Sequence, residues 1–134
     1  MENEQLSATI LQAAFEVSNE LGAGFVESVY QKSLLIALMN KGLEAKAEVA
    51  IDVEFRGENV GRFYADILVE DKIILELKAV DSFVKQHFAQ ILNYLKATDL
   101  PTGLILNFGK PRLEYRRFDN RFCSTAVLNP RSEV

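Results

Sequence analysis

Cysteine is almost absent from this chain of 134 residues, which contains only Cys123. A single thiol cannot form a disulfide within the chain, nor can it supply the four cysteine ligands of a zinc or iron–sulfur site. We therefore expect no iron–sulfur cluster. Because disulfides belong to oxidising compartments, the scarcity of cysteine favours a cytoplasmic location.

Long apolar stretches are also missing. No apolar run approaches the roughly 20 residues that a membrane-spanning helix needs. The first residues, from Met1 to Gln5, are acidic, whereas a secretory signal would be basic and then apolar. We therefore expect neither a secretory signal nor a membrane partner.

Proline is scarce as well, with three residues that all lie after position 100, and no internal repeat, low-complexity tract or Pro/Ser-rich linker is present. The hydrophobic fraction of 49% and the charged fraction of 25% are typical of a folded globular protein. The length fits one domain of about 100–200 residues. We therefore expect a single domain over residues 1–134.

The charge is unevenly distributed along the chain. The net charge is −4, so the protein is not expected to coat nucleic acid indiscriminately. Residues 110–134 are nevertheless basic overall, which indicates either an anionic partner or simply a solvated strand and tail. The basic residues of this segment are Lys110, Arg112, Arg116, Arg117, Arg121 and Arg131.

The spacing of apolar residues predicts two helices followed by three strands. Helical spacing covers residues 5–21 and 26–39, and glycines end both segments. Alternation of apolar and polar residues then predicts strands over 45–55 and 60–69. A third strand over 73–80 is apolar on nearly both faces, which predicts a central position in the sheet.

The rest of the chain predicts one helix and two strands. Asp81-Ser82 is a candidate N-cap for a helix that ends near residue 98. Strands are predicted over 103–108 and 112–118. The order α-α-β-β-β-α-β-β indicates an α/β fold in which helices flank a mixed sheet.

Two charged residues interrupt the third strand. Glu76 and Lys78 are two positions apart, so on a strand they face the same side. If residues 70–72 form a tight turn, Asp66 lies roughly opposite Glu76, with Cβ atoms about 5 Å apart. Two such carboxylates raise each other's pKa unless a cation lies between them. The spacing therefore predicts either a site for a hard ion such as Mg²⁺ or a buried ion network that includes Lys78.

Polar side chains on the helix after this strand are candidates for contacts with a substrate. Gln90 and Tyr94 share one face of that helix, and an amide and a phenol suit phosphate, sugar or base contacts. A solvent-facing helix is the alternative. Glu27 at the start of the second helix is either a complement to the helix dipole or a third carboxylate. Tyr30, one turn later, is either a substrate contact or a core residue.

Four short motifs follow one another along these elements. The sequence around Glu27 matches the GxxExxY signature, and the other motifs are an acidic residue, a Glu-x-Lys step and a Gln-x-x-x-Tyr step. In chain order they are Gly24-Phe25-Val26-Glu27-Ser28-Val29-Tyr30, Asp66, Glu76-Leu77-Lys78 and Gln90-Ile91-Leu92-Asn93-Tyr94. Over residues 5–118 the chain thereby resembles the GxxExxY protein family, a branch of the PD-(D/E)XK nuclease superfamily. The last motif is similar to that of recombination-type nucleases.

This resemblance implies a restriction-endonuclease-like fold that binds Mg²⁺ or Mn²⁺ and hydrolyses phosphodiester bonds. Glu27, Asp66 and Glu76 would be metal ligands, with the carbonyl of Leu77 as a further one. Lys78 would complete the catalytic set.

Gln90, Tyr94 and Tyr30 would be the substrate contacts, and the substrate would be nucleic acid, DNA in the first instance. A nuclease of this kind would act in repair, recombination or defence. A homodimer is compatible with a small nuclease that cuts duplexes, although no sequence feature requires one. The alternative is a catalytically inactive module of the same fold that binds nucleic acid or a protein partner. Another alternative is a structural subunit whose buried ion cluster sets the register of the sheet.

Overall fold

The computed structural model describes residues 3–120 of the chain. Cys123 and two of the basic residues noted above, Arg121 and Arg131, lie outside the described residues. The elements occur in the predicted order, which confirms the mixed α/β fold. They are α1 (Asn3–Leu21), α2 (Glu27–Asn40), β1 (Ala45–Phe55), β2 (Glu58–Val69), β3 (Ile73–Lys78), α3 (Lys85–Thr98), β4 (Thr102–Asn107) and β5 (Glu114–Asp119).

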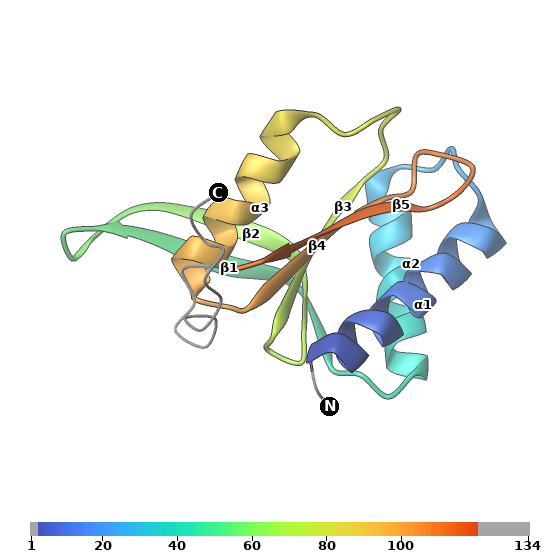
Figure 1. The fold of residues 1–134 in the computed structure, drawn as a ribbon, viewed down its shortest axis with the longest axis horizontal. Helices are drawn as coiled ribbons and strands as arrows, with labels where there is room; N and C mark the ends of the chain where they lie inside the picture. The colour runs from blue at the N-terminus through green and yellow to red at the C-terminus, as the bar shows by residue number, and fades with distance from the viewer. Residues whose placement is uncertain (1–2, 121–134) are drawn as a thin grey trace.

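The five strands form one mixed sheet in the spatial order β1-β2-β3-β4-β5 (Figure 1). β1, β2 and β3 are antiparallel neighbours, β3 and β4 are parallel, and β5 is antiparallel to β4. The parallel pair needs a crossover connection, which α3 supplies. β3 is the central strand, as its nearly continuous apolar sequence predicts.

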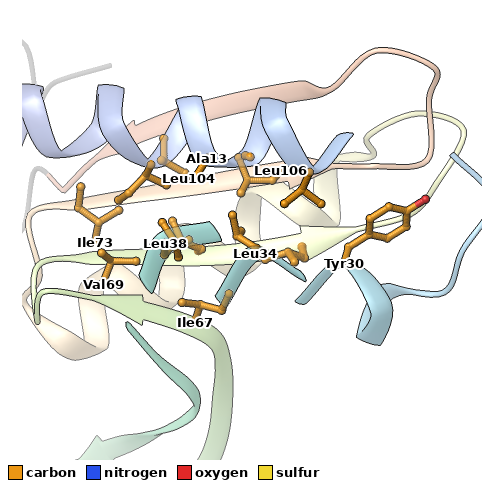
Figure 2. Packing of buried hydrophobic residues seen from close by; sticks show 14 of the residues in the cluster. Ala13, Tyr30, Leu34, Leu38, Ile67, Val69, Ile73, Leu104 and Leu106 are labelled. Carbon is orange, nitrogen blue, oxygen red and sulfur yellow. The ribbon is translucent and has the colours of Figure 1, made fainter. Parts of the chain in front are cut away.

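Helices α1 and α2 cover one face of the sheet and bury its larger core. Completely buried leucines one turn apart on α2, Leu34 and Leu38, pack against β2, β3 and β4 (Figure 2). Burial of each such side chain stabilises the fold by about 1.5–3 kcal/mol. The strand residues labelled in Figure 2 are Ile67, Val69, Ile73, Leu104 and Leu106.

Helix α3 packs on the opposite face, where the core is smaller. Tyr94 and Leu95 of α3 contact a cluster that includes Ile74 of β3. Because successive strand residues alternate between faces, Glu76 and Lys78 follow Ile74 to the α3 side of the sheet. The site described below therefore lies on the face with the thinner apolar layer.

The β1–β2 hairpin extends past the rest of the sheet as an arm (Figure 1). β1 and β2 pair as far as Phe55 and Glu58, whereas β2 pairs with β3 only over Ile67–Val69. The tip is a two-residue turn in which Arg56 and Gly57 both have positive φ, 52° and 82°. Such a turn matches the twist of the two strands that it joins.

Helix α3 begins later than the sequence predicts. The prediction of a cap at Asp81-Ser82 is wrong, because α3 starts at Lys85 with Val84 in the N-cap position. The Nδ1 atom of His87 accepts a hydrogen bond from the Val84 N–H at 3.2 Å, so this histidine caps the helix. Phe83 packs against Phe88, with ring centroids 5.5 Å apart, which holds the preceding residues outside the helix.

The chain directly after β3 is held in place by Asn107. β3 ends at Lys78, two residues before the predicted end. The buried Oδ1 of Asn107 accepts hydrogen bonds from the N–H groups of Val80 and Gly109, at 3.0 and 2.9 Å. Its Nδ2 donates to the Val80 carbonyl at 3.0 Å. These bonds fix the position of the strand end that carries Lys78.

Even the longest helix of the described chain, α1 with 19 residues, carries polar residues along one side. Within residues 3–120, no helix combines the length and the apolar character that a bilayer crossing would need.

We predict that Gly109→Ala strongly destabilises the fold. A Cβ atom at Gly109 would lie 2.4 Å from the backbone nitrogen of Val80 and 2.5 Å from its oxygen. Overpacking costs about 1–3 kcal/mol and occasionally more, and backbone atoms cannot move aside as a flexible side chain can. Urea unfolding should show a loss of about 3 kcal/mol.

Gly61→Ala is the matched control, because the nearest atom to its Cβ would be a side-chain carbon of Phe63 at 3.4 Å. This change should alter the free energy of unfolding by less than about 1 kcal/mol. Equal losses of stability in Gly109→Ala and Gly61→Ala would contradict the tight packing of Gly109 against the Val80 backbone.

Candidate active site

β2 and β3 separate at Asp66 and Glu76, and the two carboxylates occupy the gap. Regular pairing of the strands ends at Ile67 and Leu75. Beyond that point, Glu76 Oε2 accepts a hydrogen bond from the Asp66 N–H at 3.0 Å. Asp66 Oδ2 accepts one from the Leu77 N–H at 2.8 Å. The predicted contact of Asp66 with Glu76 is therefore confirmed, and the carboxylates replace the acceptors that an opposite strand would supply.

Burial makes this pair of charges costly. Glu76 is 4% exposed, and desolvation, with the charge of Asp66, raises its pKa to about 8. Burial also raises the pKa of Asp66, and the charges of Glu27 and Glu48 add to this effect. Neighbouring buried carboxylates are stable in ionised form when a cation compensates them. The gap between β2 and β3 thus has the charge and the oxygen atoms that a cation site needs.

Lys78 lies on the same side of β3 as Glu76, two residues further along. Its positive charge lowers the pKa of both Asp66 and Glu76, although burial outweighs this effect. None of the ion pairs among residues 3–120 includes the Lys78 ammonium. A lysine near two carboxylates but not paired with either can contact a further group.

Glu27 approaches the same gap from a different element. It is the first residue of α2, where a negative charge complements the helix dipole. Its Oε2 accepts a hydrogen bond from the N–H of Ala79, the residue after Lys78, at 3.2 Å. The structure therefore places Glu27 at the end of β3, next to Lys78, although it lies about 50 residues before Lys78 in the chain.

Tyr30 is a core residue that holds the turn preceding Glu27. Its side chain is completely buried, and its ring stacks on Phe108 with centroids 4.8 Å apart. The hydroxyl donates to the Gly22 carbonyl and accepts from the Phe25 N–H. A ring without exposed surface does not reach a substrate, so the structure corrects the substrate-contact prediction in favour of the core alternative. Tyr30 anchors the turn that presents Glu27.

Glu48 is an acidic neighbour of the site that sequence reasoning missed. Alternation predicted a regular strand over residues 45–55, but the backbone of Glu48 has a left-handed φ of 54°. Gln31 Nε2 donates to Glu48 Oε2 at 2.8 Å and to the Asp66 carbonyl at 2.9 Å. One amide of α2 thus holds Glu48 next to the backbone of Asp66, a contact that no local sequence pattern reveals.

Helix α3 supplies Gln90 and Tyr94, one turn apart. Gln90 Nε2 donates to the Tyr94 hydroxyl at 3.1 Å. Burial raises the pKa of Tyr94, and the charges of Glu76 and Asp66 raise it further. Tyr94 also packs in one cluster with Ala65 and Ile74, which precede Asp66 and Glu76 by one and two residues, so the α3 pair lies near the carboxylates. Its contact with a substrate stays a prediction.

The basic segment near the C-terminus is partly neutralised within the fold. Arg117 forms ion pairs with Glu4 at 2.9 Å and with Asp119 at 3.2 Å. The guanidinium of Arg116 lies 5.5 Å from the centroid of the Phe83 ring. These contacts weaken the interpretation of the segment as a surface for an anionic partner.

The donor atoms around the gap suit a hard divalent ion. Carboxylates of Asp66, Glu76 and Glu27 are the oxygen ligands that Mg²⁺ and Mn²⁺ prefer. The N–H and carbonyl of an extended residue point to the same side of its strand, so the Leu77 carbonyl faces β2 as well. In the described chain, no three His, Cys, Asp or Glu side chains already form a metal-ligand cluster. Each of the three carboxylates instead accepts a backbone N–H, and a bound ion would share or replace those bonds.

The sequence model of the PD-(D/E)XK nuclease superfamily matches residues 4–118, a range that runs from α1 to β5 and includes the whole site. The chain belongs to this superfamily. The broader part of the resemblance drawn from the motifs is thereby confirmed, and the fold is that of a PD-(D/E)XK nuclease. Membership of the narrower GxxExxY branch stays a prediction.

A solved structure shows a similar fold. The chain is similar to the crystal structure of SSO0001, with a TM-score of 0.56 and 17% identity over 78% of this chain, and it spans 59% of the length of that chain. It also matches an alkaline exonuclease, LHK-Exo, from Laribacter hongkongensis, with a TM-score of 0.46 and 11% identity over 89% of this chain and 82% of the other. Among proteins of curated function, none matches in sequence.

We predict that Glu76→Gln stabilises the metal-free protein at alkaline pH. The folded pKa of about 8 lies above the ordinary value of 4.5, so the folded state holds this proton more tightly than the unfolded state does. The resulting contribution to stability is complete below about pH 4.5 and is lost as the pH rises through about 8. Glutamine keeps the shape and the acceptor but does not ionise.

Urea unfolding in a chelating buffer at pH 5 and pH 8.5 measures this difference. The gain from Glu76→Gln should be larger at pH 8.5, on the order of several kcal/mol. Glu58→Gln, at an exposed position of the arm, is the control and should follow the wild-type profile. Parallel profiles for wild type and Glu76→Gln would show that Glu76 is not destabilised by burial.

Proposed function

We propose that this protein is a divalent-metal-dependent nuclease that hydrolyses phosphodiester bonds of DNA, in repair, recombination or defence. The observation that carries the proposal is the partly buried contact of Asp66 with Glu76, with Lys78 on the same side of β3. Membership of a nuclease superfamily supports nucleic acid as the substrate. The choice of DNA rests on the likeness of the Gln90 and Tyr94 motif to that of recombination-type nucleases.

Asp66 and Glu76 would hold Mg²⁺ or Mn²⁺, and Glu27 and the Leu77 carbonyl are the further donors within the same opening. When bound, the ion would supply a Lewis acid for the scissile phosphate and lower the pKa of a bound water. Without it, the carboxylates repel phosphate, so nucleic acid should bind weakly to the metal-free protein.

Lys78 acts on the water and the phosphate. Its ammonium has three donors, which can orient an attacking water and stabilise the negative charge that grows on the phosphate oxygens. Its strand is fixed by the hydrogen bond from the Phe108 N–H to the Lys78 carbonyl, at 2.8 Å. Gln90 and Tyr94, from α3 on the same face of the sheet, position the nucleic acid.

We also assign the chain to the GxxExxY branch, because the signature residues have connected roles. Gly24 has a φ of 117°, which only glycine adopts readily. Tyr30 anchors the same turn, and Glu27 reaches the site from it. A cytoplasmic location and a homodimer stay predictions from the sequence.

Lys78→Ala is predicted to lower the cleavage rate by about 10²–10⁴-fold, because a positioned proton donor or acceptor typically contributes that factor. The measurement uses labelled single-stranded and double-stranded DNA with Mn²⁺. Lys41→Ala is the control, since it removes the same charge from the far end of α2, where Lys41 pairs with Glu16 at 2.9 Å. Equal cleavage by wild type and Lys78→Ala would reject the catalytic role. Binding of DNA without any cleavage by the wild type would favour the inactive module.

Asp66→Asn is predicted to weaken binding of Mn²⁺ at least about tenfold. Isothermal titration of the metal alone gives this affinity without any need for cleavage. Asp52→Asn is the matched control, because Asp52 lies on the arm and pairs with Arg62 at 2.6 Å. A loss of the same size in both variants would argue against an ion between β2 and β3.

A further inference from the structure

A groove lies between α3 and the outer part of the β1–β2 arm. Its volume is about 760 Å³, within the range of roughly 300–1,000 Å³ that is typical of sites for small organic groups. Aromatic rings of Phe63 and Tyr94 line it, together with the amides of Gln86, Gln90 and Asn93. Only Gln90 and Tyr94 belong to the active site described above, so most of this surface has no role there.

Phe63 forms an aromatic wall of the groove that is supported on one side and open on the other. Its ring centroid lies 6.1 Å from that of Tyr94, yet the residue is 49% exposed. An aromatic ring held by a neighbour and open to solvent offers a flat surface on which a nucleobase can stack. Stacking of this kind is tolerant of sequence, because every base has a π-face.

The polar lining suits the edge of a base better than a phosphate. The amides of Gln86, Gln90 and Asn93 carry both donors and acceptors, as base edges do. Glu54 also lines the groove, where its carboxylate repels a phosphate but accepts a hydrogen bond from an amino group. Lys96 lies along the same surface, so the charge of the lining is mixed.

The groove is continuous with the active site through Tyr94. This residue lines the groove, and its hydroxyl accepts a hydrogen bond from Gln90. It also packs in one cluster with Ala65 and Ile74, which precede Asp66 and Glu76 by one and two residues. A nucleotide with its base in the groove would therefore have its phosphodiester on the side of the carboxylates.

We propose that this groove binds one unpaired base of single-stranded DNA, stacked on Phe63 and contacted at its edge by the α3 amides. The inference rests on the proposed nuclease function and adds to it the class of substrate. A base within an intact duplex is already stacked on both faces and paired at its edge, so it would first have to leave the helix at a cost in free energy. Single strands should therefore bind better than blunt duplexes.

The absence of tryptophan from the chain allows a direct test. Phe63→Trp and Phe55→Trp each create a single fluorescent reporter on the arm, one in the groove and one outside it. Phe55 is 59% exposed and is the matched control. Each variant is titrated with a single-stranded oligodeoxynucleotide and with a blunt duplex of the same length, in Ca²⁺, while anisotropy of the labelled DNA reports binding.

The single strand should quench the emission of the residue-63 reporter by about half or more, because an indole loses fluorescence when a base stacks on it, and should leave the residue-55 reporter nearly unchanged. The duplex should bind about tenfold more weakly. Phe63→Ala should weaken binding of the single strand about tenfold, whereas Phe63→Tyr should bind as the wild type does, since it keeps the ring. Thermal unfolding of each variant confirms that it folds.

Binding of the single strand without selective quenching at residue 63, or with unchanged affinity in Phe63→Ala, would overturn the inference. So would emission at residue 63 that depends on protein concentration alone, which would indicate a second copy in the groove. If the wild type cleaves DNA while one of these results overturns the groove, the nuclease proposal stands without it. Quenching without cleavage would support the groove and reject the nuclease, and absence of both binding and cleavage would reject both.

Discussion

The partly buried contact between Asp66 and Glu76 is the constraint on which the rest of the structure depends. Two backbone N–H groups at this point bond to carboxylates rather than to the opposite strand, so β2 leaves β3 there. Once the strands separate, β1 and β2 continue as an arm (Figure 1). The opening for a cation and the groove beside α3 therefore both follow from one local departure from regular sheet pairing.

One face of β3 contributes to the stability of the fold, and the other carries the charged residues of the candidate site. On the α1 and α2 side, Ile73, Leu75 and Leu77 are buried in the larger core, and Figure 2 shows Ile73 among its neighbours. On the other side, Glu76 is kept in an environment that disfavours its charge. The larger core offsets that cost, and a pair of neighbouring groups with perturbed pKa values is typical of functional sites.

The order of the elements and much of the site could be predicted from the sequence. Apolar periodicity is a local property, so it indicated the helices, the strands and the central position of β3. The short turn over residues 70–72 brought Asp66 opposite Glu76, because register in a tight hairpin leaves little choice. The start of α3 was missed, since the packing of Phe83 against Phe88 overrides the local capping signal of Asp81-Ser82.

The sequence by itself determined the element order, the acidic pair and the nearby lysine, because these depend on period, turn length and residue type within short segments. Only the tertiary structure decided that Glu27 reaches the site, that Tyr30 is buried beneath it and that Glu48 turns toward Asp66. It also decided that Phe63 faces α3 across a groove. These contacts join residues far apart in the chain, and packing of whole elements, which no local pattern encodes, sets which side chains meet.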